Sequence, residues 1–433
     1  MTTNIRYSVK RTIILILVLA VGIVKLSAQG NFPKWEKGYM DIHHIETGRG
    51  NCCFIMMPDG TTMMIDAGDF DVENFEKNYA PMTAPQIFPN SSYTVGGSII
   101  NYLSNIMGPG KARIDYFLLT HFHNDHYGSV VKDSPTSVNG YRLAGVTAVG
   151  DVVPIRHWID RAWPDYNYPV NLKDNPKGNG GIEPESFNNL LKFISFQVKN
   201  KGMKAEAFQV GTDKQFRLLY EAKSFPTFSV RNIKANNLVW TGKGSKTREL
   251  FTLGELLAKG RYNDNQMSTA VVVRYGNFKY YAGGDNSGLV DQDHKEWYDI
   301  ESQMAPVIGK VDAMSLNHHS NRDATNQTFL QTLDPKVVVA QAWSPDHPGA
   351  EVGHRLISAN IGTQKRDIFY TYFHPETSIG MGPWFEKRLK SKVGSVVIRV
   401  APNGEYRVYV LDARMSTPTV IATYGPYTAH AEK

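Results

Sequence analysis

The stretch Leu119-Thr-His-Phe-His-Asn-Asp-His-Tyr-Gly128 places three histidines and one aspartate within six residues, and an apolar run that predicts a buried strand precedes it. Residues two apart in extended backbone point the same way, so His121 and His123 can converge on one ion. Asp125 and His126 follow in a turn and offer ligands to a second ion nearby. Imidazole and carboxylate are the ligands expected for Zn²⁺ or a similar divalent ion. A histidine-rich surface loop is the alternative, but the strand end and the adjacent carboxylate favour a metal site.

Two other places in the chain repeat this arrangement of polar residues after an apolar strand. Asp285 follows two glycines, which allow close backbone approach, and a carboxylate there can bridge two cations. His318 and His319 follow the predicted strand 311–316. Alone, each pattern is as often a turn or a structural histidine pair as a ligand. Their shared position past a strand end is where loops build sites in α/β proteins.

Apolar runs and turn signals predict strands and helices along the whole chain. We expect strands at 40–45, 52–57, 61–65, 116–120, 216–220, 228–233, 270–275, 279–282, 311–316, 337–342, 394–400 and 406–411, and helices at 96–107, 183–201, 296–308 and 326–333. The pattern loosens at about 130–262, which we interpret as an insertion within one domain, residues 29–433. The alternation of strands and helices predicts a layered α/β protein with mixed sheets.

The first 28 residues have the pattern of a secretory signal peptide: basic residues, an apolar run at 13–24, and then Leu26-Ser-Ala28. The run is shorter than the roughly 18 residues that suggest a spanning helix, and a retained anchor is the alternative. Loss of these residues removes four basic side chains and lowers the formal net charge from +6 to +2. We therefore expect an exported protein, periplasmic or extracellular, with no stable membrane span after cleavage and no specific nucleic-acid partner.

The only two cysteines, Cys52 and Cys53, are neighbours on a predicted strand. Their side chains point to opposite faces there, and no other cysteine exists to pair with either. We expect two small buried apolar side chains and no disulfide framework.

The order of these motifs resembles the metallo-β-lactamase superfamily of metal-dependent hydrolases, and most closely its ComEC/Rec2-like branch. In that branch the motifs D-V-G-Q-G-D, I-D-A-G, H-x-H-x-D-H-x-G, G-D, H-H-G-S and G-H-P follow one another. The counterparts here are, in the same order, Thr47-Gly-Arg-Gly-Asn51, Ile65-Asp-Ala-Gly68, His121-Phe-His-Asn-Asp-His-Tyr-Gly128, Gly284-Asp285, His318-His-Ser320 and Asp346-His-Pro348. Asn265-Gln-Met-Ser268 is also similar to an N-x-x-S motif of the family. The resemblance covers most of 40–412 and implies a four-layer αβ/βα sandwich with a dinuclear site at one sheet edge.

The resemblance also implies which residues hold the two divalent ions, for which we expect Zn²⁺, with Mn²⁺ as the alternative. His121 and His123 would bind the first ion. The ligands of the second ion would be Asp125, His126 and His318, and Asp285 would bridge the two ions. His318 is preferred to His319 because it comes first in the pair, nearest the strand end.

Further residues are expected around these ligands. Asp66 and His319 would hold the ligand residues through hydrogen bonds. His347 would donate a proton or contact phosphate, although a turn residue before Pro348 is the alternative. Catalysis is thus expected from Asp125, Asp285 and His347. Many superfamily members have a further histidine ligand in the middle of the chain, and His157 is the only histidine between 127 and 284.

Two other positions depart from the family pattern. Asn51 replaces the acidic residue of the first loop, and the glycine of H-H-G-S is replaced, giving His318-His-Ser-Asn321. Neither change removes an expected ligand. Both lie beside the site, so they bear on the substrate.

The function expected from these residues is that of an exported hydrolase in which a dinuclear centre converts water into a hydroxide nucleophile. The family branch points to a phosphodiester substrate, on a small molecule or a polymer. Carboxylic ester, thioester or lactam hydrolysis is the alternative within enzymes. A binding protein that keeps the metal without turnover is the alternative outside them.

Overall fold

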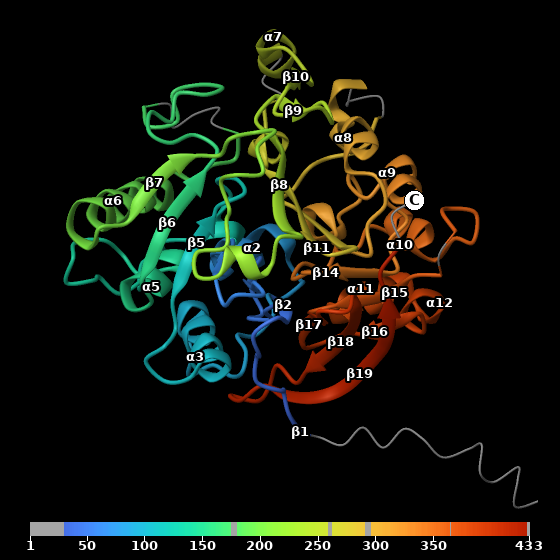
Figure 1. Cartoon of the computed structure of the whole chain (residues 1–433). Coiled ribbons are helices and arrows are strands. Elements are labelled where there is room, and N and C mark those ends of the chain that lie inside the picture. The colour runs from blue at the N-terminus through green and yellow to red at the C-terminus, as the bar shows by residue number, and fades with distance from the viewer. Residues whose placement is uncertain (1–29, 175–179, 259–261, 291–295, 364, 431–433) are drawn as a thin grey trace, which may run out of the picture.

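The computed structural model describes residues 30–174, 180–258, 262–290, 296–363 and 365–430 (Figure 1). The predicted signal segment, 1–28, lies outside these residues. Among those described, no helix combines the length and the apolar character that crossing a membrane requires.

Two large sheets are formed by the strands of the described residues. The ten-stranded sheet, called the first sheet here, has the order β1 (Gly30–Asn31), β19 (Thr419–Thr428), β18 (Glu405–Leu411), β17 (Ser395–Val400), β2 (Met40–His44), β3 (Cys53–Met56), β4 (Thr62–Ile65), β5 (Ile114–Leu118), β6 (Ile155–Asp160), β7 (Lys204–Ala207). The nine-stranded second sheet has the order β10 (Thr247–Glu249), β9 (Leu238–Trp240), β8 (Phe228–Ala235), β11 (Ala270–Tyr275), β12 (Phe278–Gly283), β13 (Ala313–Ser315), β14 (Val337–Ala340), β15 (Asp367–Tyr370), β16 (Leu389–Ser391). Both sheets mix parallel and antiparallel pairs, as the sequence predicts.

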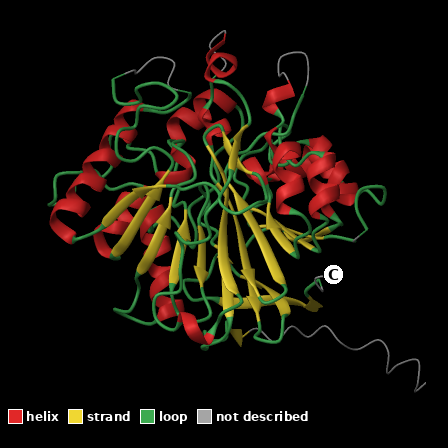
Figure 2. Cartoon of the chain, turned by 45° about the horizontal axis from the view of Figure 1, so that its top comes forward, coloured by secondary structure: helices red, strands yellow, loops and turns green. Residues whose placement is uncertain are grey.

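Helices cover the outer face of each sheet, so that the strands lie between two helical layers (Figure 2). The α-helices are α2 (Val72–Tyr79), α3 (Val95–Met107), α4 (Asn124–Tyr127), α5 (Gly145–Val152), α6 (Pro184–Lys201), α7 (Leu253–Leu257), α8 (Ile300–Ile308), α9 (Gln327–Leu333), α10 (Ala350–Ile357), α11 (Pro375–Met381) and α12 (Pro383–Glu386). In Figure 1, α3, α5 and α6 lie on the side of the first sheet, and α8, α9 and α10 lie on the side of the second. This is the four-layer αβ/βα arrangement predicted from the sequence.

Among the described residues, three large apolar cores hold the layers together, and a small fourth one contains Val397, Leu411 and Val420. One lies between the sheets and includes Ile42, Leu118 and Val339. A second packs the second sheet against its helices, and a third packs the first sheet against α3, α5 and α6. Strands β2 to β5 are buried along their whole length because the sheet is covered on both faces, which explains the largely apolar sequences of β3, β4 and β5. Strand β2 is equally buried although it contains Asp41, His43 and His44.

The stretch 130–262 contributes strands to both sheets: β6 and β7 extend the first sheet, and β8 to β10 extend the second. The prediction of a strand at 216–220 is wrong. Phe216 and Leu218 do enter the core between the sheets, which explains the alternating pattern. However, the backbone N–H of Arg217 donates to the Tyr116 hydroxyl, and that of Leu219 donates to the Thr61 hydroxyl, so no strand ladder forms.

Candidate metal centre

The histidine motif lies in the loop that follows β5, a strand paired in parallel with β4 and β6. The side chain of Phe122 is buried against Phe187. The flanking residues His121 and His123 turn together to the other side, with ring centroids 4.7 Å apart. Strand alternation therefore continues past the strand end and pairs these two imidazoles, as the sequence predicts.

Asp66, at the end of β4, holds His126 and the start of the loop. Its carboxylate accepts hydrogen bonds from the backbone N–H of Thr120 (2.9 Å), from the Thr120 hydroxyl (2.9 Å) and from Nδ1 of His126 (2.7 Å). Because Nδ1 of His126 donates to Asp66, Nε2 is left to face Asp285 at 3.2 Å. Asp66 therefore orients the candidate ligand His126 through a hydrogen bond to Nδ1, the nitrogen that does not face Asp285.

Gly50 and Gly68 let their loops approach the segment 119–128, called the metal loop here. A Cβ atom at Gly68 or at Gly50 would overlap the backbone carbonyl oxygen of Asp125. The backbone N–H of Asn51 donates to the same oxygen at 2.8 Å. The loop 47–51 thus holds Asp125 through backbone contacts. These contacts do not depend on the side chain at position 51.

Asp285 follows β12 and comes from the opposite sheet. It is 2% exposed, and its backbone N–H donates to the Ser268 hydroxyl at 2.9 Å. A Cβ at Gly284 would lie 2.8 Å from the Thr120 side chain, so only glycine lets the two sheets approach this closely. The carboxylate consequently stands between the two halves of the molecule.

The loop after β13 presents His318 and His319 in left-handed backbone, with φ of 47° and 51°. Successive left-handed residues send the two rings apart. His319 Nδ1 donates to the Gln341 carbonyl at 2.8 Å, and its Nε2 lies 2.9 Å from Asp125 and 3.5 Å from Asp285. His319, and not the predicted His318, therefore joins Asp125 and His126.

His318 instead lies beside this group. Its Nδ1 is 2.5 Å from Asp323, and its Nε2 is 3.2 Å from the Asn265 amide nitrogen and 3.7 Å from Asp285. The prediction preferred His318 because it is nearest the strand end, but in the left-handed turn it is the ring of His319 that lies among the other candidate ligands.

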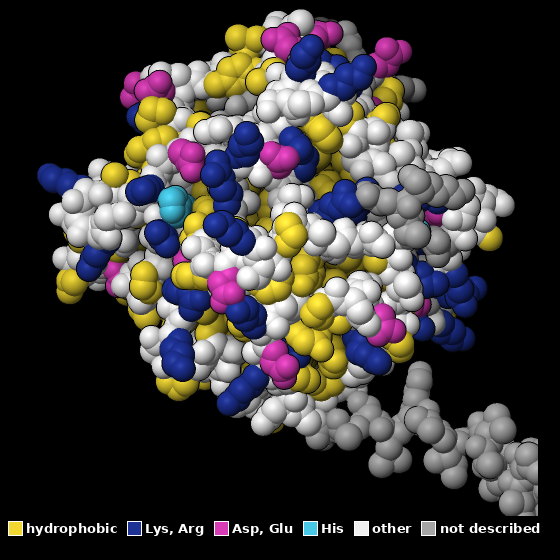
Figure 3. Space-filling model, viewed as in Figure 1, with side chains coloured by type: hydrophobic (Ala, Val, Ile, Leu, Met, Phe, Trp, Pro, Cys, Tyr) yellow, Lys and Arg dark blue, Asp and Glu magenta, His cyan; other side chains and the backbone are white. Residues whose placement is uncertain are grey.

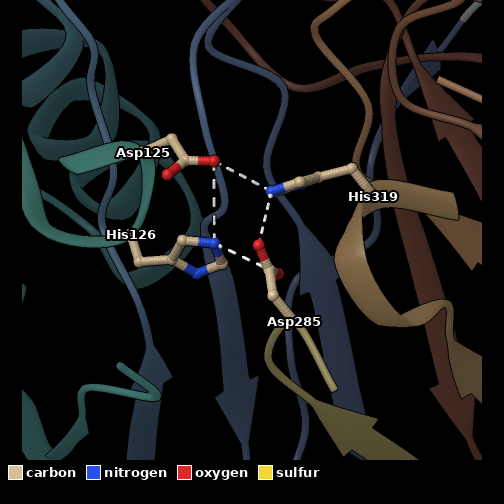
Figure 4. Close-up of side chains that lie close together, drawn as sticks. All are labelled: Asp125, His126, Asp285 and His319. Atoms are coloured by element: carbon tan, nitrogen blue, oxygen red, sulfur yellow. Dashed lines mark ion pairs between the residues drawn. The ribbon is translucent and has the colours of Figure 1, made fainter. Parts of the chain in front are cut away.

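The candidate ligands form two groups that share Asp285. One contains Asp125, His126, Asp285 and His319 (Figure 4), and the other contains His121, His123 and Asp285. Within each group, one ligand atom per residue lies within 4.8 Å of the others. Figure 4 shows the four side chains of the first group converging from both halves of the molecule.

Charge is concentrated in this buried place. Burial opposes the charged form of each imidazole, but Asp285 and Asp125 outweigh it and raise the pKa of His319 to about 10. Burial likewise opposes ionisation of Asp285, yet His126, His319 and His318 hold its pKa well below the usual value. The buried carboxylates thus require cationic partners, a role that a divalent ion can fill.

The donor set fits divalent metal. Nε2 of His121 has no hydrogen-bond partner among the described residues and lies 3.8 Å from Asp285. His123 Nε2 donates to the Gly180 carbonyl at 2.9 Å, which leaves its Nδ1 to face the group. Hydrogen bonds to the other ring nitrogen also orient His126 and His319, as is typical of metal-binding histidines.

His347 packs face to face on His319, with ring centroids 4.9 Å apart. Its Nδ1 accepts from the backbone N–H of Ser344 at 3.3 Å, so Nε2 carries the proton. Burial lowers the pKa of His347 to about 3 in spite of Asp346, which makes it a neutral hydrogen-bond donor beside the site.

His157 belongs to neither ligand group. It lies within β6, away from the strand ends, with its ring 5.1 Å from Tyr116.

Sequence reasoning missed several residues that support the site, above all Asp264. This buried carboxylate accepts from the backbone N–H of Phe122 at 2.7 Å and pairs with the buried guanidinium of Arg161. Its position immediately before the Asn265-Gln-Met-Ser268 motif could have marked it. Asp323 and Gln341 had no such signal.

No family model and no curated protein matches the chain. Solved structures that resemble it include a mutant of the CmlA β-hydroxylase, with 12% identity, 77% of this chain and 53% of that chain covered, and a TM-score of 0.37. Unliganded yeast PDE1 is another, with 10% identity, 82% of this chain and 97% of that chain covered, and a TM-score of 0.34. The Zn²⁺-bound PqqB of Methylobacterium extorquens has 10% identity, 82% and 99% coverage and a TM-score of 0.34. The chain spans about half the length of the CmlA structure, and similarity at these TM-scores supports no conclusion about function.

Proposed function

We propose that this chain is a metal-dependent hydrolase of the metallo-β-lactamase superfamily, with a dinuclear centre that cleaves a phosphodiester. The observation that carries the proposal is the pair of ligand groups sharing the Asp285 carboxylate. Two adjacent sets of imidazole and carboxylate donors are typical of centres that hydrolyse esters. The order of the motifs along the chain supports the ComEC/Rec2-like branch.

Some of these residues would bind the ions, and others orient the ligands. His121 and His123 would hold one ion. Asp125, His126 and His319 would hold the other, and Asp285 would contact both. Bound divalent ions would lower the pKa of water and polarise the ester oxygen.

The chain's own groups supply orientation and protons. Asp66 and the Gln341 carbonyl fix the tautomers of His126 and His319 by accepting from their Nδ1 atoms. Asp125 faces the same space from the metal loop and can accept a hydrogen bond from the attacking water. The protonated Nε2 of neutral His347 can donate to an anionic substrate oxygen.

A phosphodiester is preferred to a carboxylic ester, thioester or lactam because of the family branch alone. We also propose export, which the pattern of residues 1–28 supports. Lys and Arg are spread over the face in Figure 3 among acidic and hydrophobic side chains, which does not favour a nucleic-acid track on that face.

The test is hydrolysis of bis-(p-nitrophenyl) phosphate by the mature chain loaded with Zn²⁺ or Mn²⁺. We expect turnover that EDTA abolishes and that falls by at least about 100-fold in His121→Ala. His157→Ala is the matched control, because this histidine lies outside both ligand groups, and it should keep full activity. Elemental analysis should find two metal ions per chain.

Absence of turnover after metal loading would contradict the phosphodiester proposal. If the same loaded protein cleaves p-nitrophenyl acetate, the ester alternative takes its place. If it binds two ions and cleaves neither compound, the proposal of a hydrolase fails.

A further inference from the structure

Four aromatic side chains form a connected group beside the metal ligands: Phe70, Phe75, Tyr79 and Trp343, called the aromatic cluster here. Phe70 lies against Trp343 with ring centroids 4.5 Å apart. Phe75 contacts Phe70 at 5.3 Å and Trp343 at 5.9 Å, and it stacks on Tyr79 at 4.7 Å. Three of the rings come from α2 and the residues before it, and the fourth follows β14.

The aromatic cluster begins at the metal centre. The ring of Trp343 meets His319 edge-on at 5.7 Å and His347 edge-on at 5.1 Å. At its other end, the charges of Asp346 and Asp125 are near enough to contribute, after burial, to raising the pKa of the Tyr79 phenol. A substrate held at His319 therefore has aromatic surface next to it on this side.

These rings lie outside the main apolar cores. None of the four belongs to an apolar core of the described residues, and only Phe75 is buried. Tyr79 is 38% exposed, and Phe70 and Trp343 are half-buried. Accessible rings that line up from a reactive centre are suited to stacking on a ligand.

The aromatic cluster also offers polar groups. Nε1 of Trp343 is buried and has no hydrogen-bond partner among the described residues, although an indole N–H usually finds one. The guanidinium of Arg49 lies 5.0 Å from the centre of the Phe70 ring. A ligand with a flat ring would use the stacking surface of the aromatic cluster.

We infer that the aromatic cluster binds a planar ring of the substrate, so that the hydrolysed ester carries an aromatic or heteroaromatic group next to the scissile bond. The inference deepens the proposed function and rests on it for the position of that bond. The ring lies on the exposed side of Tyr79 and Trp343.

The first experiment compares phenylphosphonate with methylphosphonate, which offer the same anion to the metal-loaded protein and differ in the ring. We expect calorimetry to give about tenfold tighter binding of phenylphosphonate, the upper end of one stacking contact. Tyr79→Leu should reduce this preference to about twofold or less and leave methylphosphonate unchanged. Trp384→Leu is the matched control, because Trp384 is equally exposed, at 38%, but stacks on His354 instead, and it should keep the full preference.

The second experiment needs no metal. Benzamide and cyclohexanecarboxamide share an amide, but only benzamide is planar, and ligand-observed NMR can rank their binding to the EDTA-treated protein. We expect benzamide to bind more tightly, and Trp343→Leu, which removes the ring, to weaken its binding. If neither planar compound is preferred, or if Tyr79→Leu keeps the preference, the aromatic cluster is structural only and the inference is wrong. If both phosphonates fail to bind while benzamide is still preferred, the proposed function fails and the ring site stands.

Discussion

At the scale of single residues, the geometry of the site depends on which ring nitrogen of each histidine is hydrogen-bonded to a residue outside the ligand groups. Asp66 holds Nδ1 of His126, the Gln341 carbonyl holds Nδ1 of His319, and the Gly180 carbonyl holds Nε2 of His123. Each contact leaves the other nitrogen directed at the carboxylates. Residues without any catalytic pattern of their own therefore decide the geometry of the ligands.

The adjacent histidines should differ in their effect on metal binding. We expect His319→Ala to release one of two bound Zn²⁺ ions, because it removes a ligand from the group with Asp125 and His126. His318→Ala should retain both ions, with affinity reduced by about tenfold or less, because its Nε2 meets only Asp285, at 3.7 Å. Zn²⁺ counted by competition with a chromophoric chelator distinguishes the two variants, and equal losses would show that both histidines are ligands.

Glu46 should make stability depend on pH. Burial raises the pKa of this carboxyl to about 7, although hydrogen bonds from Thr371 and Gly48 oppose the shift. Since the folded-state pKa lies above the unfolded one, the stabilising contribution is complete below about pH 4.5 and is lost as the pH rises through about 7. Glu46→Gln cannot ionise, so its free energy of unfolding relative to the native chain should increase by up to ~3 kcal/mol between pH 5 and pH 8.

Urea unfolding of the EDTA-treated proteins across this pH range measures the difference. Glu351→Gln, at an exposed position, is the control and should run parallel to the native chain. A Glu46→Gln curve that also runs parallel would contradict the buried, protonated carboxyl.

At the scale of elements, a buried ion pair connects the metal loop to the middle stretch of the chain. Arg161 follows β6, and its guanidinium pairs with Asp264, which precedes β11 and also accepts from the Phe122 N–H. Tyr262 donates its hydroxyl to the same carboxylate at 2.5 Å. The segment that contains Asp264 therefore supports the two histidines on either side of Phe122.

Removal of Asp264 should weaken both stability and metal binding. Asp264→Ala leaves the Arg161 guanidinium buried without its carboxylate, which should lower the free energy of unfolding by about 3–5 kcal/mol. Zn²⁺ affinity should fall as well, since the loop loses its anchor at Phe122. The control is Asp213→Ala, which removes the partly exposed pair with Arg231 and should cost about 1 kcal/mol or less. Similar losses in urea unfolding for the two variants would contradict the role of Asp264.

At the scale of the whole molecule, the centre joins the two sheets. Asp125 and His126 come from the short helix α4, which follows β5 of the first sheet, whereas Asp285 and His319 follow β12 and β13 in the second. Metal bound there would cross-link the halves of the sandwich. Folding and metal binding are then coupled, because the ligand groups exist only in the folded chain.

Metal should consequently stabilise the entire domain. At free Zn²⁺ 1,000-fold above the dissociation constant, we expect about 4 kcal/mol of added stability and a higher Tm by calorimetry. Asp285→Ala should abolish the shift, since both ligand groups use this carboxylate. Tyr220→Ala, at an exposed tyrosine on the protein surface, should keep it. Equal Tm values with Zn²⁺ and with EDTA would contradict coupling between the sheets.

The family resemblance of the motifs implied the four-layer arrangement. Local periodicity predicted the central strands of both sheets, helices α3, α6, α8 and α9, and the pairing of His121 with His123. These features depend on backbone alternation and on burial of apolar runs, which adjacent residues determine. The same reasoning predicted a strand at 216–220, where apolar side chains enter the core without a ladder. It also missed the helices other than α3, α6, α8 and α9, and it missed strands β1, β6, β7, β9, β10, β15, β16 and β19. Strand β6, for example, pairs with β5 and β7, which are distant from it in the sequence.

Only the tertiary structure decided between His318 and His319, because left-handed backbone at both residues separates their rings and Gln341 and Asp323 each capture one of them. It also brought Asp264 to Phe122 and placed Trp343 and α2 beside His319. Contacts between residues this far apart in sequence depend on how the two sheets pack. By itself the sequence determined which residue types could bind metal, whereas the packing of the sheets determined which of them meet.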